Sequence, residues 1–198
     1  PPGMAGKPEY FVDGEAFTYD PEKAKELLAE SEVEPLYSAI YYEPDPLAVA
    51  GAKVAQKGLE EAGFTVKYTP VQESPYSTWT NPDDKLNKSL TVRGVNWCSD
   101  WPSGSTFIPA LFRGGATYNT GGFAEDSIDE MIAEVPNMPI DEQADAWGDI
   151  DEKIMTEFFP AIPVNYYNNL FTFGSKIGNP SGDEALGAPN YKNVFVMQ

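Results

Sequence analysis

Two strand-like segments separated by one helical segment constrain the fold of this chain most. Residues 36–42 alternate in character and are rich in strand-forming side chains, and residues 64–68 repeat that alternation. Pro44-Asp45-Pro46 ends the first segment and starts a helical pattern that stops at Gly63. Strand, helix and strand in this order predict a parallel βαβ unit, so we assign the chain to the α/β class.

Amphipathic patterns predict further helices. Asp20 and Pro21 open one of them, with Asp20 placed to cap free backbone N–H groups. Two more follow the acidic openings at Asp126 and Asp141. The apolar side chains expected to face the core are Leu47, Ala50, Val54 and Leu59 in the helix after Asp45, and Ile128, Met131, Ile132, Val135, Ala144, Trp147, Ile150, Ile154 and Met155 in the last two helices.

Further strands are expected at residues 90–97, 161–167 and 194–197, because each is a short apolar or alternating run. Residues 1–17 are rich in Pro and Gly and predict an irregular lead-in. A chain of 198 residues can bury about 70% of its unfolded surface, so it needs no metal or disulfide to fold. None of its apolar runs approaches the length of a membrane span.

Composition excludes several functional classes. The net charge is −18, and 13 Lys and Arg against 31 Asp and Glu leave no basic stripe for a nucleic-acid partner. The chain has no His, which removes Ser-His-Asp and Cys-His catalysis and His-containing metal sites. It also lacks a glycine fingerprint for a dinucleotide or phosphate, so we expect no cofactor and no metal.

Paired carboxylates are the remaining signal for catalysis. Asp83-Asp84 and the pair Asp149 and Asp151 have the chemistry that glycoside hydrolysis uses. However, Asp149 and Asp151 are two residues apart in a helical pattern, so they point to different sides. We therefore expect no catalytic residue and no enzyme, with a secreted carboxylate-dependent hydrolase as the alternative.

The segment Arg93–Ile108 carries the strongest signal for ligand binding. It begins as a predicted strand, ends in a turn rich in Pro, Gly and Ser, and places Asp100 between aromatic residues. A carboxylate beyond a strand end suits a ligand cation, and a solvated turn is the alternative. Cys98 has no basic partner, so we expect a half-buried structural side chain. The aromatic residues that could line a pocket are Trp79, Trp97, Trp101, Tyr118, Tyr166 and Tyr167.

Several segments, taken in order, resemble the extracellular solute-binding proteins of family 5, the peptide/nickel-type receptors of ABC importers. Tyr19–Leu28 resembles the Asp-Pro-x-x-Ala-x-x-Leu-Leu helix of that family, and Gly58–Val66 resembles its helix-to-strand step. Trp97-Cys98-Ser99-Asp100-Trp101 is similar to the Trp-Cys-Ala-Asp-Tyr of the oligopeptide-binding members. Later landmarks of the same resemblance are residues 128–132, 162–164 and 190–196.

The resemblance implies the C-terminal lobe of a two-lobed, periplasmic-binding-protein-like fold of type II, cluster C. Such a receptor closes over its ligand like a hinged clamp. Residues 1–189 would form the C-terminal substrate-binding lobe, incomplete at its N-terminal side. Residues 190–198 would form a tail strand that returns to the other lobe. The opening Pro1-Pro2-Gly3-Met4 looks like the middle of a loop, which also predicts a fragment of a longer chain.

The resemblance also implies a ligand site. In the oligopeptide-binding members the Asp of this motif receives the α-ammonium group of the peptide, and that role carries to Asp100. A buried ammonium group needs a charged partner, and a carboxylate hydrogen bond to it is strong. Together with Asp100, the expected ligand contacts are Trp97, Trp101, Cys98, Ser103, Asn119, Tyr166 and Tyr167.

Partners and location are further implications of the resemblance. It implies an extracytoplasmic protein, either periplasmic or anchored as a lipoprotein on the outer cell surface. The expected partners are a peptide or another small extracellular solute and the ABC permease subunits in the membrane, and the protein itself is expected to be a monomer. An oligosaccharide receptor of the same fold is the alternative, because Trp faces also stack on sugars.

Overall fold

The computed structural model describes residues 19–164, 169–183 and 186–197. These residues divide into two compact units, with the boundary between Val95 and Asn96. We call residues 19–95 the βαβ unit and the described residues from Asn96 onward the helical unit. The predicted irregular lead-in, residues 1–17, lies outside the described residues.

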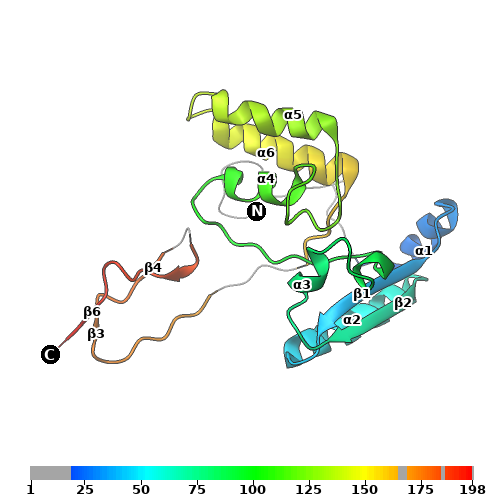
Figure 1. The fold of residues 1–198 in the computed structure, drawn as a ribbon, viewed down its shortest axis with the longest axis horizontal. Coiled ribbons are helices and arrows are strands. Elements are labelled where there is room, and N and C mark those ends of the chain that lie inside the picture. Colours follow the sequence, from blue (N-terminus) through cyan, green and yellow to red (C-terminus); the bar gives the residue numbers. More distant parts are fainter. Residues whose placement is uncertain (1–18, 165–168, 184–185, 198) are drawn as a thin grey trace. The chain divides into compact units, whose positions relative to one another are not determined.

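The βαβ unit confirms the parallel pairing predicted from the sequence. β1 (Leu36–Tyr42) and β2 (Thr65–Val71) are parallel neighbours, in a register that places Leu36 opposite Thr65. α2 (Pro46–Glu61) connects them, and Figure 1 shows it lying along the two strands. Three consecutive residues of β1, Ser38, Ala39 and Ile40, are buried, which is typical of a strand covered on both faces.

Local signals set the ends of the first two helices. The carboxylate of Asp20 accepts a hydrogen bond from the Lys23 N–H at 2.9 Å, just before α1 (Pro21–Glu30). The carboxylate of Asp45 accepts from the Leu47 N–H at 2.9 Å in the same way. Gly63 follows α2 with a φ of +96°, a conformation that glycine adopts without strain. The predicted cap of α1 at Asp20 is confirmed, and so are the predicted start and end of α2.

The predicted apolar stripe of α2 is partly wrong. Leu47 is 81% exposed and Val54 is 74% exposed. Ala50 is exposed as well, whereas Leu59 lies on the less exposed side of the helix with Ala48, Val49 and Ala52. Of the predicted stripe, only the position of Leu59 is therefore confirmed.

The strand predicted at residues 90–97 does not form. The N–H groups of Thr91 and Val92 both donate to the Ser38 carbonyl, at 3.0 and 3.1 Å. The Thr91 hydroxyl accepts from the Ser38 N–H at 2.8 Å and donates to the Leu36 carbonyl at 2.9 Å. The Thr91 side chain therefore makes hydrogen bonds to β1 that the backbone of a paired strand would make. As a result, the segment contacts β1 without forming a ladder of backbone hydrogen bonds with it.

A buried amide organises the chain between β2 and this segment, around α3 (Tyr76–Trp79) and η1 (Asn87–Ser89). Asn87 is 4% exposed. Its side-chain nitrogen donates to the carbonyls of Thr78, Trp79 and Asn81, at 2.8, 3.1 and 2.9 Å. The Arg93 guanidinium donates to the side-chain oxygen of Asn87 at 2.5 Å and to its carbonyl at 2.8 Å. Arg93 therefore braces the βαβ unit.

The helical unit is built on an apolar core. α5 (Asp126–Glu134) and α6 (Gln143–Lys153) lie side by side, with the short α4 (Ile108–Phe112) beside them (Figure 1). Two turns, η3 (Val135–Asn137) and the π-helical η4 (Ile154–Phe158), follow α5 and α6. The buried cluster contains Ile108, Ile128, Ile132, Val135, Trp147, Ile150 and Ile154. All but Ile108 were predicted to face the core, which confirms these helix faces.

The predicted caps of α5 and α6 are wrong by one residue. Glu125 and Glu142 occupy the two cap positions, and neither makes a side-chain capping hydrogen bond. Asp126 is the first residue inside α5, and Asp141 lies before the cap of α6. Burial of their apolar faces therefore holds these helices without the capping bonds that we expected.

The last part of the chain forms short strand pairs. β3 (Ile177–Gly178) pairs antiparallel with β6 (Phe195–Val196), and β4 (Gly182–Asp183) with β5 (Ala188–Pro189). β6 lies within the strand predicted at 194–197. The described part of the strand predicted at 161–167, residues 161–164, is irregular. In the three described ranges, no helix is both long and apolar enough to cross a membrane.

Candidate functional site

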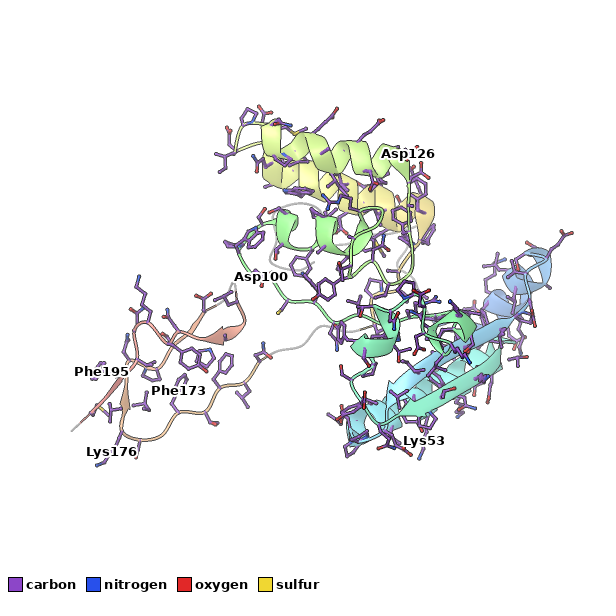
Figure 2. The ribbon with its side chains drawn as sticks, in the orientation of Figure 1. Lys53, Asp100, Asp126, Phe173, Lys176 and Phe195 are labelled. Carbon is purple, nitrogen blue, oxygen red and sulfur yellow. The ribbon has the colours of Figure 1, made fainter. Side chains whose placement is uncertain are left out.

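The motif around Asp100 forms an irregular loop at the start of the helical unit. Figure 2 labels Asp100 on this loop, which leads through η2 (Gly104–Thr106) into α4. We call residues 97–106 the Asp100 loop. Its centre is Thr106, which is only 3% exposed, while the side chains of Cys98, Asp100 and Trp101 are exposed. A buried polar residue beneath exposed ones indicates a loop with a defined shape.

Asp100 is bound to Thr106 through both its backbone and its side chain. The Asp100 N–H donates to the Thr106 hydroxyl oxygen at 2.9 Å. The Thr106 hydroxyl donates to Oδ2 of Asp100 at 3.3 Å. Within the described ranges, Oδ1 of Asp100 forms neither a hydrogen bond nor an ion pair. The loop therefore directs one carboxylate oxygen, on a residue that is exposed as a whole.

Trp97 and Tyr118 form an aromatic pair on one side of the loop. The Trp97 Nε1–H donates to the Thr106 carbonyl at 2.6 Å. The ring of Trp97 packs on that of Tyr118, with a centroid distance of 4.7 Å and an interplanar angle of 58°. Trp79, another candidate pocket residue, lies in the βαβ unit, where it packs against Tyr76 and the backbone of Gly94.

Trp101 is half-exposed and is held by a short serine network. Its Nε1–H donates to the Ser105 hydroxyl at 2.8 Å, and this hydroxyl donates to the Ser103 hydroxyl at 3.0 Å. The Ser103 hydroxyl also accepts from the Ser105 N–H at 3.2 Å. Ser103 was among the residues predicted from the sequence, whereas Ser105 and Thr106 were not. Their signal was a run of small polar residues directly before a helix, which also occurs in ordinary turns.

The other predicted contacts lie in different settings. Cys98 is exposed and unpaired, so the expectation of a half-buried side chain is wrong. The Asn119 amide donates to the carbonyls of Arg113 and Phe123, at 3.1 and 2.5 Å, and accepts from the Phe123 N–H at 3.0 Å. Asn119 therefore braces its own loop. Tyr166 and Tyr167 lie outside the described residues.

The described residues offer no obvious centre for a metal ion. Among them, no three His, Cys, Asp or Glu side chains are grouped so that they could hold one. The Asp100 loop carries side chains of other kinds. It combines an oriented carboxylate, aromatic faces and hydroxyl groups already engaged with one another.

Comparison with known proteins gives one family and one fold. Residues 1–119 match the model for the middle region of the bacterial extracellular solute-binding proteins, family 5. A comparison with curated protein sequences gives no match. The three solved structures described next are each less than 25% identical to this chain, so they show the fold alone.

These three structures illustrate the match. NikA from Staphylococcus aureus, in complex with Ni(L-His)2, has a TM-score of 0.69 and 14% identity over 97% of this chain and 40% of its own. OppA from Burkholderia pseudomallei has a TM-score of 0.63 and 19% identity over 78% of this chain and 31% of its own. The pheromone receptor PrgZ, described with its mode of peptide binding, has a TM-score of 0.69 and 16% identity over 100% and 39%. This chain thus spans about two fifths or less of each.

Proposed function

The chain belongs to the bacterial extracellular solute-binding proteins, family 5, and from this membership we propose that it is the C-terminal lobe of a peptide receptor of an ABC importer. The match to periplasmic binding proteins supports the α/β, two-lobed fold predicted from the sequence. The proposed lobe comprises residues 1–189, with residues 190–198 returning to the other lobe. The receptor works outside the cytoplasm as a monomer and delivers its ligand to the permease subunits.

In this proposal Asp100 binds the α-ammonium group of the peptide. The observation that supports the assignment is the exposed Asp100 residue, whose Oδ2 accepts a hydrogen bond from the buried Thr106 hydroxyl. A carboxylate in this state needs no rearrangement to accept an N⁺–H donor, and charge-assisted hydrogen bonds of this kind are among the strong ones. The result is reversible binding, and no bond in the ligand is made or broken.

Aromatic residues supply the walls beside the carboxylate. The Trp97–Tyr118 pair and the half-exposed Trp101 offer broad apolar faces that accept varied side chains. Ser103 supports Trp101 through Ser105. Contacts from Cys98, Asn119, Tyr166 and Tyr167 to a ligand stay predictions.

The test uses the complete receptor, because a clamp with one lobe lacks half of its contacts. We compare the binding of one peptide with a free amino terminus and the same peptide N-acetylated, by isothermal titration calorimetry. Replacing Asp100 with Asn should weaken binding of the free-amine peptide about 10- to 100-fold, since hydrogen bonds to charged groups contribute roughly 1.5–3 kcal/mol. Binding of the acetylated peptide should stay unchanged.

Asp126→Asn is the matched control. Asp126 is also an exposed acidic residue of the helical unit. It is the first residue of α5, where Figure 2 labels it, and it is not part of the Asp100 loop. This variant should bind both peptides like the unchanged receptor. Equal affinity of the Asp100→Asn receptor for the free-amine peptide would exclude the ammonium role. Tight binding of an oligosaccharide, with indifference to peptide acetylation, would favour the sugar receptor instead.

A further inference from the structure

We propose that Thr106 is a positioning residue that directs the Asp100 carboxylate toward the ligand ammonium group. This inference rests on the proposed function and extends it to a residue that does not touch the ligand. Thr106 is almost completely buried, yet its hydroxyl and its carbonyl are both engaged with the Asp100 loop. A buried polar side chain is retained at little cost only when its hydrogen bonds are made.

The hydroxyl of Thr106 can play only one part toward the Asp100 side chain. A hydroxyl has a single proton to donate and lone pairs with which to accept. Its oxygen accepts the Asp100 N–H at 2.9 Å, so its proton is free to be donated to Oδ2 of the same residue at 3.3 Å. The two bonds close a small ring that restricts rotation of the carboxylate. Oδ1 is then held in one direction before any ligand arrives.

The backbone of Thr106 holds the other end of the motif. Its carbonyl accepts the indole N–H of Trp97 at 2.6 Å. One residue therefore fixes the proposed aromatic wall through its backbone and the proposed charge through its side chain. This division is useful because a substitution at position 106 can remove the hydroxyl while the carbonyl, and the bond to Trp97, remain.

If the Asp100 carboxylate is oriented before the ligand binds, the receptor should have a higher affinity for that ligand. A carboxylate that already points to the ligand loses less rotational freedom on binding than one that must be ordered at that moment. The effect applies only to ligands that use the carboxylate. Thr106 should therefore matter for a peptide with a free amine and be nearly irrelevant for its acetylated counterpart, whereas a general structural role would weaken both.

The experiment compares Thr106→Val, which removes the hydroxyl at nearly constant volume, with Thr106→Ser, which keeps it. In the complete receptor, Thr106→Val should weaken binding of the free-amine peptide about 5- to 10-fold, the effect of roughly one hydrogen bond. Binding of the acetylated peptide should change less than about twofold by the same measure. Thr106→Ser should bind both peptides like the unchanged receptor. If Thr106→Val does not fold, Thr106→Ala is compared with Thr106→Ser instead.

The double variant separates this proposal from the proposed function. With Asn at position 100, adding Thr106→Val should cause no further loss of free-amine affinity, since there is no charge left to direct. If Asp100→Asn alone has no effect, both proposals fail. If Asp100→Asn weakens binding but Thr106→Val leaves it unchanged, or weakens both peptides equally, only the positioning role fails. Faster hydrogen exchange of the Asp100 amide in Thr106→Val than in Thr106→Ser would support it independently of any ligand.

Discussion

The helices of the two units are stabilised in opposite ways. α1 and α2 of the βαβ unit each have an Asp side chain that caps the first turn and a Pro in that turn, and neither contains a fully buried residue. α5 and α6 of the helical unit have no side-chain cap bond, yet they bury Ile128, Ile132, Trp147 and Ile150. Local hydrogen bonds define the first pair, and shared apolar contacts define the second.

The two units also differ in how far their predicted apolar helix faces are buried. In the helical unit, the large apolar side chains of the predicted faces are in the core. In the βαβ unit, Leu47, Val54 and Leu27 remain on the surface although their helices are well formed. In α1 and α2 the capping bonds set the first turn locally, so the position of that turn does not require Leu27, Leu47 or Val54 to be buried. A helix without caps forms only where its apolar face is covered.

The largest expected effect is on the core of the helical unit. Ile128 is completely buried, so Ile128→Ala should lower the free energy of unfolding of that unit by about 2–5 kcal/mol. Leu47→Ala, at an exposed site of α2, should change the βαβ unit by less than about 0.5 kcal/mol. Urea unfolding followed by amide NMR signals of each unit measures both. Similar losses in the two units would contradict the comparison.

The next effect concerns two asparagines that brace loops. Asn87→Ala should cost the βαβ unit about 2–3 kcal/mol, because it removes a nearly buried amide that bonds the carbonyls of Thr78 and Asn81 and accepts from the Arg93 guanidinium. Asn119→Ala in the helical unit should cost less, about 1 kcal/mol, since water can reach the groups that it releases. The same urea titration measures both. An equal cost would show that burial does not decide the value of these amides.

Removing a cap tests the comparison directly. Asp45→Ala should destabilise the βαβ unit by about 1 kcal/mol through the lost bond to the Leu47 N–H. Glu142→Ala, at the corresponding position of α6, should change stability by only about a few tenths of a kcal/mol, since its side chain makes no cap bond. Thermal unfolding of both variants gives the comparison. A clear loss in Glu142→Ala would mean that α6 also depends on its end.

The smallest effect is a dependence on pH in the βαβ unit. The Tyr19 hydroxyl donates to the Glu61 carboxylate at 2.5 Å. This bond is the largest cause of a lowered pKa for Glu61; loss of hydration opposes it by raising the pKa, and Lys57 lowers the pKa further. A lowered folded-state pKa adds stability that is present above the unfolded value of about 4.3 and is lost as the pH falls through the folded value.

Tyr19→Phe removes that bond while keeping the ring. The unchanged chain should lose stability of the βαβ unit more steeply below about pH 4.3 than the variant does. The helical unit should show the same acid dependence in both proteins, which makes it an internal control. The measurement is a series of thermal unfolding scans between about pH 3 and 6, in steps of roughly half a pH unit. Parallel curves for the βαβ unit would exclude the contribution of the Tyr19–Glu61 bond.

The candidate site was predictable in part. The sequence motif around Asp100 indicated where to look for the site, because an acidic residue between two Trp residues after a strand-like run is an unusual combination. The sequence could not show that Thr106 and Ser105 support this loop. Their bonds to Asp100 and Trp101 depend on the loop folding back over four to six residues, which no periodic pattern records. Asn119 shows a second limit of sequence reasoning. A polar residue in a turn has the same sequence signal whether its side chain binds a ligand or, like Asn119, makes hydrogen bonds to the backbone of its own loop.

The sequence by itself determined the α/β class, the parallel βαβ unit and the apolar faces of α5 and α6. Each of these depends on periodicity or on residues within one turn, such as Asp45 before its helix and Gly63 after it. The tertiary structure alone decided that residues 90–97 form no strand and that Leu47 lies outside the core. A strand needs a partner that supplies alternate bonds, and here Ser38 supplies a single carbonyl to two N–H groups. Which apolar residue is buried depends on what packs against it, and that information lies elsewhere in the chain.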